Sequence, residues 1–202
     1  ACSEALRRDP AHTLVRKKLD NLAQKRTQQA PSSKQQVETV ESNPQDAAAL
    51  QRLGNELFRR GRFEEAASRF KAALEIDPGN ASAHSNLGNA LTRLGRFQDA
   101  ETQYREALRL DPDFAEAHNN LGSALFMQNR YEEAGREYAE ALRLKPGYAD
   151  ALDNLGSVYR QQGNLEEAVR CYGEALRVNP NHGPARSHLE ELRAAREAPR
   201  RP

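Results

Sequence analysis

The sequence contains no tryptophan, one methionine and only two cysteines among its 202 residues. Cys2 and Cys171 lie far apart, and neither belongs to a CxxC pair or a Cys/His cluster. We therefore expect neither a disulfide framework nor a zinc site. Hydrophobic residues make up 38% of the chain, which argues against one large globular core.

A net charge of either sign and a long apolar run are also missing. The 30 basic and 29 acidic side chains nearly cancel, so we expect no nucleic-acid partner. No apolar run approaches the roughly 20 residues that cross a bilayer, and no hydrophobic signal segment opens the chain. The sequence predicts a soluble protein without a membrane span and favours a cytoplasmic location. Because it begins at Ala1 rather than Met, we expect a fragment or a processed chain.

Motifs for catalysis or cofactor binding are absent as well. No GxxxxGK[ST] loop occurs. The histidines are scattered, and His84 and His118 recur at one packing position, which is typical of hydrogen-bonded helix residues rather than metal ligands. We therefore predict no enzyme activity, no cofactor and no metal site.

Prolines recur at a fixed interval, at residues 78, 112, 146 and 180, each 34 residues after the last. A fixed period of this size indicates a repeat array. The four blocks are 47–80, 81–114, 115–148 and 149–182, and positions are numbered below from the first residue of each block. Leu-Gly pairs occupy positions 7 and 8, aromatic residues position 24, and alanines positions 20 and 27 of every block.

These residues resemble the tetratricopeptide repeat, whose signature is a Leu-Gly pair in a first helix followed by Ala, an aromatic residue, Ala and Pro in a second. The resemblance covers Ala47 to His182. It implies an all-α fold, a right-handed superhelical solenoid of antiparallel helix hairpins. The family's frequent Trp at position 4 is missing, which predicts looser local packing there; its replacements are Leu50, His84, His118 and Leu152.

The residues support this fold without the resemblance. In the third block His118, Leu121 and Leu125 form an i, i+3, i+7 stripe, which favours an amphipathic helix. Gly122 and Ala134 remove side-chain bulk where two helices must approach closely. One hairpin buries too little surface to be stable alone, so stability should come from stacking.

The two ends differ from the repeats. Residues 184–198 show one apolar stripe among charged residues and predict a C-terminal capping helix, and residues 199–202 should form a disordered tail. Residues 1–10 resemble the end of a preceding repeat's second helix. Residues 11–46 are interpreted as a degenerate repeat with a basic helix and a polar linker, which favours a solvated tether over a binding arm.

Positions 2, 6, 9 and 13 of each first helix lie opposite the packing stripe at about 100° per residue. In tetratricopeptide proteins the first helices line the concave face, so the resemblance implies a groove whose amides bind an extended peptide backbone. The alternative is that these amides bond their own helix or the adjacent repeat. The candidate groove residues are Arg52, Asn55, Arg59, Asn86, Asn89, Arg93, Asn120, Ser123, Met127, Asn154 and Ser157.

Family members that bind chaperone C-termini use a clamp of Lys, Arg and Asn side chains for two carboxylates. At the matching positions here the Asn residues are present while the cations are missing, and Glu116 and Asp150 would repel a carboxylate. We therefore expect no clamp-type chaperone binding. The first two repeats carry Arg59 and Arg93, whereas the last two carry Glu116, Asp150 and Asp153. This difference predicts a ligand with an acidic segment toward the early repeats and a basic segment toward the later ones.

The sequence thus predicts a protein-interaction scaffold that holds a peptide or partner segment through a ladder of Asn residues. Two alternatives remain open. The array could be a self-associating structural module, hence a possible homo-oligomer, with Tyr148 and the repeat ends as contacts. It could also be the substrate-docking arm of an enzyme whose catalytic part lies outside this chain, because the Asn ladder resembles that of O-linked N-acetylglucosamine transferase.

Overall fold

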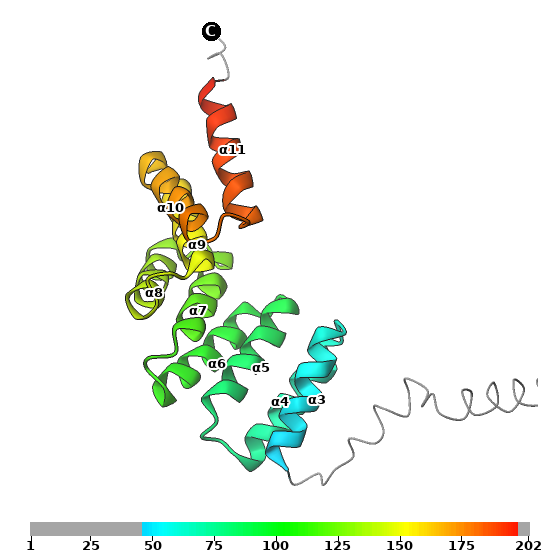
Figure 1. Cartoon of the computed structure of the whole chain (residues 1–202). Coiled ribbons are helices and arrows are strands. Elements are labelled where there is room, and N and C mark those ends of the chain that lie inside the picture. The colour runs from blue at the N-terminus through cyan, green and yellow to red at the C-terminus, as the bar shows by residue number, and fades with distance from the viewer. Residues whose placement is uncertain (1–45, 198–202) are drawn as a thin grey trace, which may run out of the picture. The chain divides into compact units, whose positions relative to one another are not determined.

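The computed structural model describes residues 46–197, and within this range every regular element is an α-helix (Figure 1). Eight of these helices pair into four hairpins, and a further helix follows them. The bounds are α3 Ala47–Arg59 and α4 Phe63–Ile76, α5 Ala81–Arg93 and α6 Phe97–Leu110, α7 Ala115–Met127 and α8 Tyr131–Leu144, α9 Ala149–Gln161 and α10 Leu165–Val178, and finally α11 Gly183–Glu197.

Local sequence sets where the helices begin and where the chain turns. The side chains of Asp46 and Asn80 cap α3 and α5 by accepting hydrogen bonds from backbone N–H groups of the first turn. The turn inside each hairpin needs one residue with positive φ. Glycine supplies it in three hairpins and Asn129, with φ 60°, in the other; asparagine tolerates this conformation better than most residues do.

Each hairpin closes where a glycine of the first helix meets an aromatic ring of the second. A Cβ atom on Gly122 would lie 2.7 Å from Cε1 of Tyr138, and the other three hairpins repeat this contact at 2.6–2.7 Å. The rings are at most 2% exposed. The four aromatic rings therefore form the centre of the core, and the glycine of each Leu-Gly pair leaves the space that its ring occupies.

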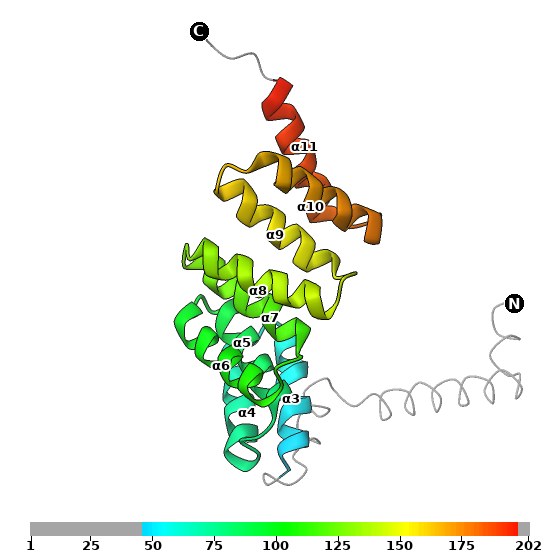
Figure 2. The same cartoon turned by 90° about the vertical axis from the view of Figure 1, so that its left-hand side faces the viewer.

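The hairpins stack in chain order, because the second helix of each one packs against the first helix of the next (Figure 2). Successive first helices also contact one another, α3 with α5, α5 with α7 and α7 with α9. Closer approach of the first helices places them on the inner side of the curve. The all-α solenoid predicted from the sequence is confirmed.

Helix α11 is the predicted capping helix. Ala185 and Leu189 of α11 are buried and pack in one cluster with Ala168, Tyr172 and Ala175 of α10. The helix begins at Gly183, one residue earlier than the sequence interpretation placed it. Residues 1–10, most of 11–46 and the tail 199–202 lie outside the described residues. No helix of the described range combines the length and apolarity that crossing a membrane requires.

Candidate functional site

The predicted groove residues all lie on the first helices, on the inner side of the stack. The exposed ones are Arg52, Arg59, Arg93 and Met127, and Met127 is 57% exposed. The Asn and Ser side chains of positions 6 and 9 are half-buried between neighbouring repeats. The structure therefore brings the predicted residues to one face, with a polar inner row and a more exposed outer row.

The Asn residues of this face bond one another across repeat boundaries. Nδ2 of Asn120 donates to Oδ1 of Asn89 in the preceding repeat at 2.9 Å, and Nδ2 of Asn154 donates to Oδ1 of Asn119 at 3.0 Å. Asn119 in turn donates to Oδ1 of Asn120 at 3.2 Å. We call this set, Asn89, Asn119, Asn120 and Asn154, the amide seam. It joins the second, third and fourth repeats.

Position 9 connects the inner face to the core. The buried hydroxyl of Tyr104 donates to Oδ1 of Asn89 at 2.8 Å, and that of Tyr138 donates to Oγ of Ser123 at 3.2 Å. Burial raises the pKa of Tyr138 to about 12, so its hydroxyl remains protonated as a donor at physiological pH. Tyr104 and Tyr138 therefore also help to fix the rotamers of Asn89 and Ser123 on the inner face.

The bonds between repeats in the amide seam have a counterpart in the capping helix α11. Sequence reasoning missed the residue that makes it. His188 lies 34 residues after Asn154 and bonds Asp153 through Nδ1 at 2.8 Å, just as Asn154 bonds the residue before Asn120. Asp153 is 5% exposed, so it belongs to the interface with α11 rather than to the open face. Extending the 34-residue count past the fourth block would have found His188.

The remaining charged residues of the inner face already have intramolecular partners. Arg59 pairs with Glu56 at 2.6 Å, and the guanidinium of Arg93 lies 4.8 Å from the centroid of the Phe63 ring. Glu116 accepts a hydrogen bond from Lys145 at 3.0 Å, which lowers its pKa. These contacts are solvent-accessible and weak enough to exchange for a ligand.

The amide seam keeps hydrogen-bonding capacity for a ligand. A primary amide has two N–H donors and two acceptor lone pairs. Asn154 uses one N–H group in the seam, and Asn120 uses one N–H group and one lone pair. Each therefore retains at least one donor and one acceptor, held in a fixed orientation at the edge of the open face.

Position 4, where the repeat family often has Trp, is filled by polar contacts in two repeats. His118 bonds Oε2 of Glu137 at 2.7 Å and the carbonyl oxygen of Pro112 at 3.1 Å. His84 makes the matching bonds to Gln103 and to the carbonyl oxygen of Pro78. These histidines tie each hairpin to the loop before it. No group of His, Cys, Asp and Glu in the described part of the chain is arranged to hold a metal ion.

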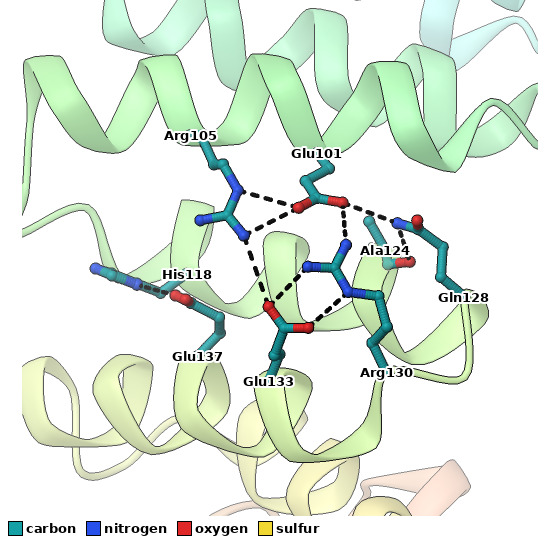
Figure 3. Close-up of polar contacts among 8 residues, drawn as sticks. All are labelled: Glu101, Arg105, His118, Ala124, Gln128, Arg130, Glu133 and Glu137. Carbon is teal, nitrogen blue, oxygen red and sulfur yellow. Dashed lines mark hydrogen bonds and ion pairs between the residues drawn. The ribbon is translucent and has the colours of Figure 1, made fainter.

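A second polar cluster lies away from the inner face, where α6 meets the α7–α8 turn and α8 (Figure 3). The side chain of Glu101 is 8% exposed and accepts hydrogen bonds from Arg105 at 2.9 Å, Arg130 at 2.7 Å and Gln128 at 3.2 Å. Burial raises the pKa of Glu101, but these donors outweigh it and the net pKa is lowered. Arg130 also holds Glu133 through two bonds of 2.7 Å.

Comparison with known proteins points to one family of repeats. PilF of Pseudomonas aeruginosa is 32% identical with a TM-score of 0.69, over 74% of this chain and 68% of that chain. MamA is 29% identical with a TM-score of 0.64, over 71% and 84%. The first tetratricopeptide domain of RPAP3 (Spaghetti), solved with the HSP90 peptide SRMEEVD, is 28% identical with a TM-score of 0.58, over 60% and 96%.

Among curated protein sequences, none is significantly similar to this chain. The family model described as the cilia and flagella-associated protein 70 C-terminal domain, a tetratricopeptide domain, matches residues 4–200. That match covers nearly the whole sequence, including the four hairpins and the capping helix. The chain therefore belongs to the cilia and flagella-associated protein 70 C-terminal domain family of tetratricopeptide repeat proteins.

Proposed function

We propose that the inner face binds an extended segment of a partner protein, with Asn86 and the Asn120 and Asn154 amides of the amide seam contacting the backbone of that segment. The fold and its relatives support a protein-interaction scaffold. The single observation that carries the finer proposal is the seam itself. Asn120 and Asn154 are oriented by bonds across repeats, and each retains at least one donor and one acceptor.

Backbone recognition suits this arrangement for a geometric reason. Peptide N–H and C=O groups recur along an extended strand whatever its side chains, and amides match both kinds of group. Holding the amides in place before binding reduces the entropy that the complex must lose. The outer row then adds side-chain preference, with Met127 as an apolar contact and Arg59 and Arg93 as sites for acidic side chains.

Fewer acidic residues face a ligand than the sequence suggested. Asp153 is buried against His188, so it does not present its charge on the open face. Glu116 and Asp150 have partners in Lys145 and His182 but remain solvent-exposed. A bound segment with acidic residues toward the first two repeats and a basic residue near Glu116 would fit this surface.

The triple variant Asn86→Ala, Asn120→Ala and Asn154→Ala should lose peptide binding. A peptide selected on the wild-type chain from a displayed random library serves as the probe, and fluorescence anisotropy measures its affinity. We expect affinity to fall at least about tenfold, because backbone donors and acceptors of the peptide lose their partners.

The matched control is Asn119→Ala. Asn119 is 6% exposed, so a ligand cannot reach it, but the substitution removes the seam bonds to Asn120 and Asn154. It should lower thermal stability and also lower affinity, but by less than the triple variant does, because Asn120 and Asn154 keep their own donors and acceptors while losing part of the contacts that orient them. Unchanged affinity in the triple variant, with the fold intact by circular dichroism, would refute the ladder.

The chaperone peptide SRMEEVD should not bind measurably to this chain. RPAP3 was solved with that peptide, but here Glu116 and Asp150 occupy positions where two carboxylates would have to be received. Isothermal titration at concentrations up to about 500 μM would check this expectation. Saturable binding in that range would show that cations elsewhere on the face replace the missing clamp.

A further inference from the structure

A surface hollow of about 320 Å³ lies between α8 and α9, where the third repeat meets the fourth. Leu155, Val158 and Tyr159 of α9 form its apolar wall, and the small residues Gly135 and Ala139 of α8 leave its space open. The hollow is internal to the array, because a described hairpin lies on each side of it. Its volume is near the lower limit of about 300 Å³ for ligand pockets, which suits one side chain rather than a cofactor.

The preceding junction shows how the same place is filled. Gly135 lies 34 residues after Glu101, and Gln162 lies 34 residues after Gln128. The side chain of Glu101 occupies that place and is 8% exposed. Nε2 of Gln128 donates a hydrogen bond to its Oε2 at 3.2 Å (Figure 3). At the third junction the sequence keeps the glutamine and lacks the glutamate.

Gln162 has a side-chain amide that the repeats do not use. It is exposed and lines the hollow, and its amide bonds no other residue in the part of the chain that the structure describes. The amide of Gln128, in contrast, also donates to the carbonyl oxygen of Ala124 at 3.1 Å. The first junction carries the apolar residues Ala67 and Leu94 at the two positions. Packing of a junction therefore does not require the glutamine, and its amide is suited to a polar guest.

Arg136 adds a positive charge to the hollow. It lines the hollow and is exposed, and it forms no ion pair with another described residue. The cations that hold Glu101, which are Arg105 and Arg130, have neutral residues as their counterparts 34 positions later. A guanidinium and a primary amide together can donate to both oxygens of one carboxylate. Glu132 also lines the hollow, and its charge opposes the entry of a second carboxylate.

Other guests match this chemistry less well. An apolar side chain would fill the space but would desolvate Gln162 and Arg136 without giving either an acceptor. A basic side chain could reach Glu132, but it would place its charge beside Arg136.

We infer that the hollow receives a glutamate side chain of a partner protein, whose methylene groups contact the apolar wall and whose carboxylate accepts hydrogen bonds from Gln162 and Arg136. This guest takes the place that Glu101 fills within the chain one junction earlier. The hollow shares no residue with the amide seam, so it is a second binding site, separate from the peptide-binding face proposed above. A partner that engages both sites gains affinity, because binding at one raises the effective concentration at the other.

An NMR titration of the whole ¹⁵N-labelled chain with N-acetylglutamate N-methylamide at pH 7 tests the site. The titration follows the amide signals of the residues that line the hollow, up to about 50 mM probe. We expect saturable shifts with a dissociation constant of about 1–10 mM, and at least about tenfold weaker binding of the corresponding glutamine and leucine derivatives. No shift with the glutamate derivative, or equal binding of either comparison compound, would overturn the inference.

Substitutions in the hollow locate the binding. Gly135→Leu fills the space and should abolish the shifts while the protein stays folded. Gln162→Leu and Arg136→Gln should each weaken binding at least about fivefold, and Glu132→Gln should strengthen it, because a like charge is removed. The matched control Gly173→Leu places the same side chain on an exposed glycine of α10 with open space around it and should leave the affinity unchanged. Probe binding that survived Gly135→Leu would place the guest elsewhere and refute the site.

The alanine variant at Asn86, Asn120 and Asn154 separates this site from the peptide-binding face. It should bind the glutamate derivative as the wild type does, whether or not it has lost the selected peptide. Loss of the glutamate derivative in this variant would mean that the probe occupies the inner face, and the inference would fail.

Discussion

Replacing Gly122 with leucine is expected to lower the free energy of unfolding by about 3 kcal/mol or more. A Cβ atom alone would lie 2.7 Å from Cε1 and 2.9 Å from Cδ1 of Tyr138. The Tyr138 ring is 2% exposed and its hydroxyl bonds Ser123, so it has no free space in which to move. The two helices of the third hairpin must separate, and urea titration followed by circular dichroism measures the loss.

The same repeat offers a control with the opposite expectation. Gly135 also lies in the middle of a helix, but a Cβ atom there would meet Val158 at 3.5 Å, an ordinary contact. It borders a surface hollow of about 320 Å³, whose lining includes Tyr131, Leu155 and Val158. Gly135→Leu should fill part of this hollow and leave stability level or higher. If Gly122→Leu proved as stable as Gly135→Leu, the close helix approach would not be required.

The repeat architecture was predictable because its signals recur. The glycine at position 8 and the aromatic residue at position 24 occur in all four blocks, and the structure joins them in every hairpin. Each block provides an independent copy of the same packing constraint, so a register error in one would conflict with the others. A fold built from local, repeated contacts is therefore readable from one sequence.

The bonding of the candidate site was not predictable in the same way. Sequence alone placed Asn120 and Asn154 on one face but left open whether they bond a ligand or the adjacent repeat, and the structure shows that they do bond the adjacent repeat. Asn119, which was not among the candidate residues, bonds both Asn120 and Asn154. Rotamers and cross-repeat distances decide such bonds, and neither follows from spacing.

The Glu101 cluster was missed because it occurs only once. The other repeats hold Ala67, Gly135 and Val169 at the same position. A comparison that looks for residues shared by all four blocks therefore does not select the glutamate. The deviation was nevertheless visible as one acidic residue in a column of small or apolar ones. Exceptions to a repeat pattern mark the contacts that are specific to one junction, here the junction between the second and third repeats.

Removing both arginines from this cluster is expected to destabilise the protein strongly at neutral pH. In the double variant Arg105→Met and Arg130→Met the apolar stems remain, but the carboxylate of Glu101 keeps only Gln128 as a side-chain donor. A buried charge without its partners is costly. We expect the thermal midpoint to fall by about 8 °C, measured by differential scanning calorimetry.

Glu101→Ala alone should cost much less, about 2 °C or under. It recreates the junction between the first two repeats, where Ala67 is buried and Arg96 pairs with Asp99 as Arg130 pairs with Glu133. In the double-arginine background the same substitution should raise the midpoint, because it removes the uncompensated charge. A triple variant less stable than the double variant would show that packing of the arginines, rather than the buried charge, stabilises this junction.

The pH dependence separates the same two explanations. Burial raises the pKa of Glu101, and hydrogen bonds from Arg105, Gln128 and Arg130 lower it below its ordinary value. The stabilisation is therefore present above the unfolded carboxyl pKa of about 4.3 and is lost as pH falls through the lower folded value. In the double variant this pKa rises, so the difference in midpoint from wild type should be largest near pH 7 and shrink below about pH 4. A difference that stayed constant across this range would mean that the charge of Glu101 does not carry the effect.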